Sequence, residues 1–225
     1  MALLVTVLMP TANPERAALT SQAWKAKGYG MAYYVDHGVS PWDDKAFTVQ
    51  GEYEGVWDAT NRLAQLMLAQ RSDVCLFAGD DMDPDPGFTA QEIGQQYLAR
   101  FPDGFGVMQP CGDPQGMDAS GRPAAARICG SAWFGPGWIK RSYRGKGPTD
   151  AHYHHFYGDE SLYEVAQKLG VLWMRPDLTQ FHRHWSWGHS QITDYQKRNQ
   201  EHWEADQKLF FASKAANFPE GEPLP

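Results

Sequence analysis

The chain has 225 residues, of which 13% are aromatic, and it carries a formal net charge of −7. This length suits a single domain, and the acidic balance argues against a dedicated nucleic-acid-binding protein, because such proteins are more often basic. Three cysteines lie far apart without a Cys-x-x-Cys pair, which disfavours both a zinc framework and a disulfide scaffold. A reducing, cytoplasmic setting is the simplest expectation.

The first half of the sequence predicts strands that alternate with helices. The apolar start lacks the basic flank of a signal peptide, and Pro10 ends it too early for a membrane span, so we expect no membrane association. In chain order the predicted elements are a strand over 3–9, a helix from Pro14 to Gly28 with Asn13 as its N-cap, a strand over 31–38 that ends at Asp36, a helix over 52–70 and a strand over 74–78. This order indicates a parallel sheet with right-handed crossovers.

The second half continues the pattern less regularly. Its predicted elements are a helix that begins with a Thr89–Glu92 capping box, a strand over 104–110, loops with short elements over 111–150, a helix over 159–170, a strand over 171–174 and a helical tail over 190–214. The last residues, 217–225, are expected to be frayed. The fold class that follows is α/β, with a mostly parallel sheet flanked by helices.

Aspartates gather where the strand over 74–78 ends. They are Asp80, Asp81, Asp83 and Asp85. In open α/β sheets, ligands bind beyond the carboxyl ends of the strands, where Asp36 is also expected. Grouped carboxylates repel one another unless a cation neutralises them, and oxygen ligands suit Mg²⁺ or Mn²⁺ bound to a substrate phosphate. The alternative is a solvated turn, in which Asp and Pro are common.

Five segments together resemble family 2 glycosyltransferases with the GT-A fold, including small members encoded by bacteriophages. In order they are VTVLMPT, YYVDHG, GVWDATNRL, CLFAGDDMDPDPGF, and YGDESLYEVAQKLG followed by FHRHW. The resemblance covers about residues 3 to 190. It implies one Rossmann-like catalytic domain, in which residues 1–110 bind a nucleotide sugar, 111–190 bind the acceptor and carry catalysis, and 190–225 form a C-terminal helix and tail.

The resemblance also implies roles for particular residues. The donor-binding residues would be Pro10, Thr11, Asp36, Asn61, Arg62 and Asp81, and the ligands of Mn²⁺ or Mg²⁺ would be Asp81, Asp83 and His182. Asp81-Met82-Asp83 fits the family's D-x-D motif best, while "GDD" leaves Asp80 open as a ligand. His184 is the alternative to His182.

A second acidic pair, Asp159-Glu160, precedes a predicted helix. The family usually has Glu-Asp there, with the second carboxylate as the base that deprotonates the acceptor hydroxyl. By position Glu160 takes this role, and by residue type Asp159 does, so the stereochemical outcome stays open. The pair can equally serve as a helix cap and a favourable charge at the helix N-terminus.

Further candidates lie between and after these motifs. Trp133 is a candidate for stacking on the acceptor, and the basic residues Arg141, Arg144 and Lys146 for contact with a diphosphate or an anionic acceptor. The histidines His152, His154 and His155 fit an aromatic wall or an acceptor contact. Trp185 and Trp187 fit either the core or a sugar-stacking platform.

These features predict a metal-dependent glycosyltransferase that uses a nucleotide-diphosphate sugar, with a UDP-sugar as the family expectation. The acceptor is open among a hydroxymethylated base in phage DNA, a glycan and a small molecule, and a phage-encoded enzyme would act in the host cytoplasm. The alternatives are a metal-dependent phosphohydrolase or nucleotidyltransferase, because strand-end aspartates serve those reactions too, and a sugar-binding module without catalysis.

Overall fold

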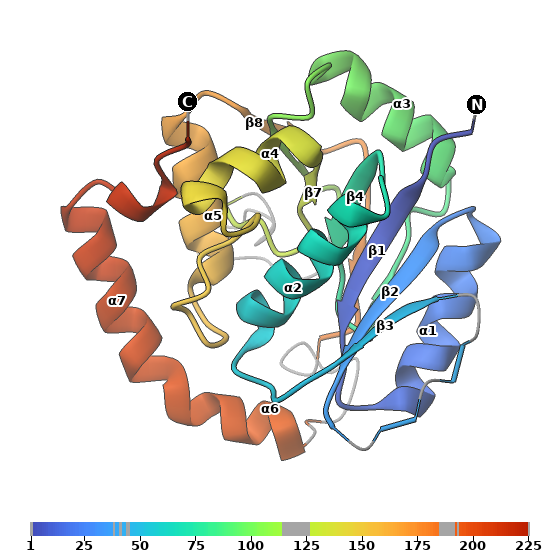
Figure 1. The fold of residues 1–225 in the computed structure, drawn as a ribbon, viewed down its shortest axis with the longest axis horizontal. Coiled ribbons are helices and arrows are strands. Elements are labelled where there is room, and N and C mark those ends of the chain that lie inside the picture. The colour runs from blue at the N-terminus through green and yellow to red at the C-terminus, as the bar shows by residue number, and fades with distance from the viewer. Residues whose placement is uncertain are drawn as a thin grey trace.

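The computed structural model describes residues 2–37, 39–40, 42–43, 46–113, 127–184, 192 and 194–224. It has a seven-stranded sheet in the order β3-β2-β1-β4-β7-β6-β8 (Figure 1). The strands are β1 (Val5–Pro10), β2 (Gly30–Val35), β3 (Phe47–Gln50), β4 (Val74–Phe77), β6 (Val107–Pro110), β7 (Trp133–Phe134) and β8 (Leu172–Arg175). β7 is antiparallel to β4 and β6, and the other pairs are parallel. The predicted fold class is therefore confirmed.

Helices cover both faces of the sheet. They are α1 (Pro14–Ala26), α2 (Val56–Ala69), α3 (Ala90–Arg100), α4 (Pro136–Arg141), α5 (Gly158–Lys168), α6 (Asp194–Asn199) and α7 (Trp203–Ala215), with 3-10 turns at Ser142–Gly145, Gln200–His202 and Pro219–Gly221. Leu8 and Cys75 point to the face covered by α2, α4, α5 and α7, whereas Val7 and Leu76 point to the face covered by α1 and α3. Burial on both faces explains why these strands read as continuous apolar runs.

Local signals set the helix ends near the strand tips. The Asn13 side chain accepts a hydrogen bond from the Arg16 amide at 3.0 Å, and Pro14 occupies the first turn of α1. Gly28 follows α1 with φ of +87°, a conformation that glycine adopts without strain. The predicted capping box of α3 is present, with Thr89 and Glu92 bonded reciprocally. Asn13 and Thr89 thus fix where α1 and α3 begin, and Gly28 marks the end of α1 before β2.

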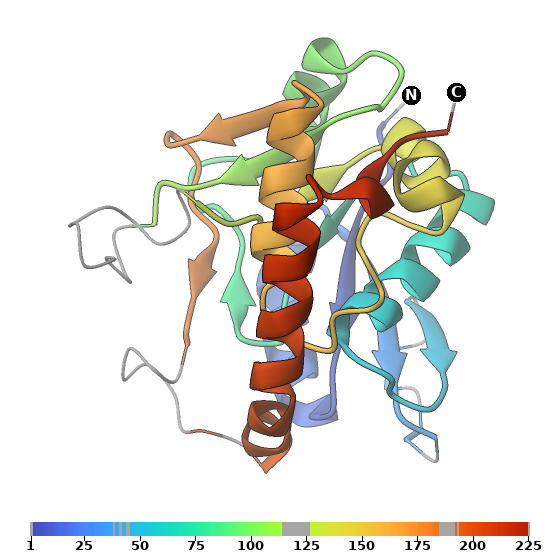
Figure 2. The same cartoon turned by 90° about the vertical axis from the view of Figure 1, so that its left-hand side faces the viewer.

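A small second sheet joins distant segments. β5 (Met82–Asp83) pairs antiparallel with β9 (Phe181–His182), and Met82 lies opposite His182. Figure 2 shows this pair beside the main sheet, with α7 running along α5. The pairing brings the aspartate cluster of the first half next to the late histidines.

The C-terminal segment is docked, so the prediction of a frayed end is wrong. Phe218 is 4% exposed and belongs to the core that α5 and α7 share. A Cβ on Gly221 would lie 2.5 Å from Val165 Cγ1, so this glycine packs directly on α5. The Leu224 amide donates to the Arg141 carbonyl at 2.7 Å. Apolar burial of Phe218 outweighs the flexibility that its Gly- and Pro-rich neighbours suggest.

Within the described ranges, none of the helices combines the length and the apolar character that crossing a bilayer requires.

Candidate active site

The carboxyl ends of β1, β2 and β4 open into a cavity of about 380 Å³. Its lining includes seven of the predicted site residues: Pro10, Thr11, Asp36, Asp81, Asp159, Glu160 and His182. His184, the alternative ligand, lines it as well. The remaining wall consists of residues from α6, from the turn Gln200–His202 and from the start of α7. The cavity therefore unites the aspartate motif, the second acidic pair and the late histidines.

Three predicted residues are not among those that line the cavity. The Asn61 side chain exchanges hydrogen bonds with Thr149 at 2.8–3.1 Å and so fastens the loop before α5. Arg62 forms ion pairs on the surface with Asp58 at 2.7 Å and with Glu54 at 3.2 Å. Asp83 forms an ion pair with Arg183.

Asp83 points to a different partner from Asp81. Both carboxylate oxygens of Asp83 accept from the Arg183 guanidinium, at 3.1 and 2.9 Å. The same guanidinium donates to Thr20 on α1 at 2.9 Å. Asp83 thereby helps to tie the small sheet to α1.

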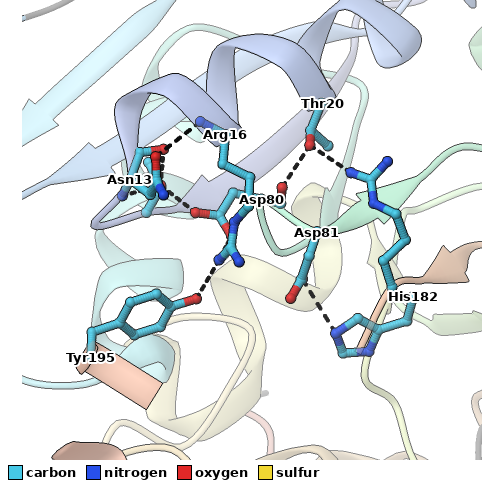
Figure 3. Close-up of polar contacts among 9 residues, drawn as sticks. Asn13, Arg16, Thr20, Asp80, Asp81, His182 and Tyr195 are labelled. Atoms are coloured by element: carbon cyan, nitrogen blue, oxygen red, sulfur yellow. Dashed lines mark hydrogen bonds and ion pairs between the residues drawn. The ribbon is translucent and has the colours of Figure 1, made fainter. Parts of the chain in front are cut away.

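Asp80 is held in a network on the other side of the cavity (Figure 3). Its carboxylate forms an ion pair with Arg16 and accepts from the Thr11 hydroxyl at 2.6 Å. Arg16 also donates to the Tyr195 hydroxyl at 2.7 Å, which attaches α6 to α1. Asp80 is 2% exposed. One carboxylate oxygen of Asp80 binds Arg16 and the other binds Thr11. Asp80 therefore serves to position the cavity wall.

Asp81 and His182 meet inside the cavity. His182 Nε2 lies 3.3 Å from Asp81 Oδ1, and the two residues are drawn together in Figure 3. Burial alone would raise the pKa of Asp81, but the hydrogen bond and charge of His182, followed by the charge of Arg16, hold this pKa below its ordinary value. The His184 ring lies 4.8 Å from that of His182. A carboxylate beside two imidazoles is a donor set that suits a divalent cation.

Asp81 and His182 lie close enough to serve the same cation. With a cation between them, Asp81 Oδ1 and His182 Nε2, which lie 3.3 Å apart, would be its protein ligands. Among the described residues, no group of three or more His, Cys, Asp and Glu side chains converges closely enough to hold an ion alone. A cation at this place would need further oxygen ligands, and substrate phosphates commonly provide them.

Asp159 and Glu160 occupy the first turn of α5. The Glu160 amide donates to Asp159 Oδ1 at 3.2 Å, and the positive end of the helix favours acidic groups there. Burial, followed by the charge and the hydrogen bond of Asp159, raises the pKa of Glu160 far above its ordinary value. Two carboxyl groups this close share one proton, because both cannot ionise without strong repulsion. Its raised pKa makes Glu160 the member of the pair that favours keeping its proton.

His155 is a cavity residue that the sequence singled out only as part of an aromatic wall or an acceptor contact. Its Nδ1 lies 3.2 Å from the amide nitrogen of Asn199, which can only donate, so Nε2 carries the proton. Burial lowers the pKa of His155 to about 4, with the charge of Asp159 opposing this shift. The ring is therefore a neutral hydrogen-bond donor at neutral pH. Among the charges that act on it are those of both Asp159 and Asp81.

Asp206 holds the backbone around His155. The sequence analysis did not identify this residue, because it belongs to no motif. Its carboxylate is 3% exposed and accepts from three successive amides, those of His154, His155 and Phe156, at 2.8–3.0 Å. The other side of this loop is fixed by the Trp57 indole, which donates to the His155 carbonyl at 3.0 Å. The loop that precedes the acidic pair is thus clamped between α2 and α7.

We expect Asp206→Ala to lower the free energy of unfolding by about 2–4 kcal/mol, because it leaves three partly buried amides without their acceptor. Chemical denaturation measures this change. Glu204→Ala is the matched control, since Glu204 is an exposed acidic residue of the same helix turn. Equal stabilities of the two variants would contradict the clamp.

Two candidates from the middle of the sequence lie elsewhere. Trp133 is completely buried in β7, and its indole donates to Gln180 at 2.7 Å, so the prediction that it stacks on an acceptor is wrong. Arg141 lies over the Phe105 ring at 4.1 Å and pairs with Asp103. Figure 1 shows α4 near the amino end of β1, at the top of the view, and α6 at the bottom. Trp185 and Trp187 lie outside the described residues.

No family model and no curated protein matches the sequence. The fold is similar to that of a glycosyltransferase involved in the glycosylation of the major capsid of PBCV-1, with 13% identity, a TM-score of 0.34, and coverage of 61% of this chain and 62% of that chain. It is also similar to a putative nucleotide-diphospho-sugar transferase from Desulfovibrio desulfuricans (8% identity, TM-score 0.41, coverage 76% and 78%). A third similar structure is 2-C-methyl-D-erythritol 4-phosphate cytidylyltransferase from Thermus thermophilus (15% identity, TM-score 0.41, coverage 77% and 88%).

The chain therefore spans less than two thirds of the length of the PBCV-1 glycosyltransferase. Similarity at this level does not identify a reaction. The choice of function rests on the residues that face the cavity.

Proposed function

We propose that the protein is a metal-dependent glycosyltransferase that moves a sugar from a nucleoside-diphosphate donor to an acceptor hydroxyl. One observation carries the proposal: Asp81 with His182, and Asp159 with Glu160, face a single cavity beyond the carboxyl ends of parallel strands. The first pair suits a cation and its phosphate, and the second suits proton transfer. A glycosyl transfer from a nucleotide sugar can use both.

The donor side of the cavity is formed by the ends of β1 and β2. Pro10, Thr11 and Asp36 lie there and are suited to contact the nucleoside and its sugar. Asp81 and His182, with His184 beside them, would hold Mn²⁺ or Mg²⁺. Such an ion supplies positive charge that stabilises a leaving diphosphate. A UDP-sugar is the first donor to test.

On the acceptor side, Asp159 removes the proton from the acceptor hydroxyl as its oxygen bonds to the anomeric carbon of the donor sugar. The bond from that carbon to the diphosphate oxygen breaks, and its electron pair leaves with the nucleoside diphosphate. Glu160 keeps its own proton throughout and donates a hydrogen bond to Asp159. The neutral imidazole of His155 supplies a further donor on the same wall.

A donor screen tests this proposal. Nucleotide sugars are incubated with the protein and Mn²⁺ without acceptor, and slow release of the nucleoside diphosphate is followed. We expect one donor, with UDP-sugars tried first, to be hydrolysed, and chelation of the metal to stop the reaction. Release of inorganic phosphate from the nucleotide, or formation of pyrophosphate from a nucleoside triphosphate, would instead identify the phosphohydrolase or the nucleotidyltransferase.

A further inference from the structure

Three aromatic residues, Trp203, Phe156 and Tyr157, form a surface at the rim of the cavity, next to the acidic pair. We call this surface the aromatic ledge. Trp203, at the start of α7, lines the cavity and is 42% exposed. Its ring contacts Phe156 at a centroid distance of 4.7 Å and Tyr157 at 5.2 Å. These two residues immediately precede Gly158 and Asp159 at the start of α5. The ledge therefore adjoins the carboxylate that deprotonates the acceptor.

The ledge is rigid although its edge faces solvent. The Phe156 amide is bound by Asp206, and the Tyr157 hydroxyl accepts a hydrogen bond from Gln207 at 2.8 Å. Tyr157 also stacks on the core residue Phe210 at 5.2 Å. A tryptophan that is held on one side and exposed on the other offers a preorganised flat surface, and binding there costs little side-chain entropy.

The charges around the cavity restrict what can stack there. Among the described residues of its lining, Arg198 is the one lysine or arginine. The basic segment 140–146 begins in α4, which lies near the amino end of β1, whereas the cavity lies at its carboxyl end (Figure 1). A nucleic acid would bring several phosphates that need cationic partners near the acidic pair. An uncharged sugar ring needs none, and its flat C–H face matches an aromatic surface.

We propose that Trp203, supported by Phe156 and Tyr157, is the platform on which the sugar ring of an uncharged acceptor stacks while its hydroxyl meets Asp159. This inference rests on the proposed glycosyl transfer and names its acceptor class. Acceptor binding at the ledge needs neither donor nor metal, so it is measurable even if the donor screen fails.

Binding is tested by NMR on the isotope-labelled indole N–H signals of the whole protein. The probes are methyl β-glucoside, methyl β-galactoside and cellobiose, with a single-stranded DNA oligonucleotide as the other arm. We expect a glycoside to shift the signal that Trp203→Phe identifies as that of Trp203. Trp203→Ala weakens this binding by about tenfold or more and raises the acceptor KM by a similar factor.

Phe47→Ala is the control, because Phe47 is a 38% exposed aromatic residue of β3 that is not in the cavity lining. We expect it to leave glycoside binding unchanged, and thermal melts of both variants verify folding. If the oligonucleotide shifts the Trp203 signal and the glycosides do not, with binding that weakens steeply as salt is added, the acceptor is a nucleic acid and the inference is overturned. The absence of any shift at Trp203 overturns it as well.

Discussion

Asp81→Asn is expected to lower metal-dependent hydrolysis of the donor, measured as kcat/KM, by about a hundredfold or more. Asparagine keeps the shape of the side chain but removes the charge that faces His182 in the cavity. The Mn²⁺ concentration needed for half-maximal rate should rise together with the loss of rate. Relaxation of water protons by bound Mn²⁺ measures the binding step separately from the reaction.

Asp83→Asn is the matched control, because it makes the same chemical change two residues away. Asp83 is paired with Arg183 and is not among the cavity-lining residues, so we expect its exchange to alter the rate by about threefold at most. An equal or larger loss in Asp83→Asn would show that the cation is held by Asp83, as the D-x-D motif of the family implies.

The second large effect concerns the acidic pair of α5. We expect Asp159→Asn to reduce glycosyl transfer by about a thousandfold, within the range for loss of a general base, while slow donor hydrolysis is reduced far less. Glu160→Gln should retain most of the transfer, because glutamine resembles the protonated carboxyl that Glu160 holds in the folded chain. The reverse result, with Glu160→Gln inactive and Asp159→Asn active, would assign the base to Glu160.

The same acidic pair makes the free energy of unfolding depend on pH. The pKa of Glu160 is raised in the folded chain, so the folded state binds this proton more tightly than the unfolded state does. Its contribution is complete below the ordinary pKa of about 4.5 and is lost as the pH rises through the raised value. Glu160→Gln removes this dependence. The melting temperature of the variant relative to the original chain should therefore increase from pH 5 to pH 8.

Much of the fold follows from local signals. The cap at Asn13, the Thr89–Glu92 box and the apolar runs of β1 and β4 each depend on neighbouring residues, and the structure contains all of them. β7 escaped prediction because it has two residues within a segment rich in glycine. Its place in the sheet is determined by β4 and β6 on either side.

The site was predictable to the level of segments but not of every side chain. The aspartate cluster was located, yet the difference between Asp81 and Asp83 depends on pairing with β9, and the Asp83–Arg183 ion pair spans 100 residues. Asp206 and Trp203 carry no motif, because their roles arise only when α7 packs beside the loop that precedes α5. Such long-range contacts leave no periodic or capping pattern in the sequence.

The walls of the cavity come from both ends of the chain, from Pro10 to Trp203. One of the bonds that close it, from Arg16 to Tyr195, joins residues 179 positions apart. During vectorial synthesis on a ribosome, a nascent chain that has not yet released α7 has neither the Asp206 clamp nor the Trp203 rim. The cavity is therefore complete only after α7 has packed against the loop that precedes α5.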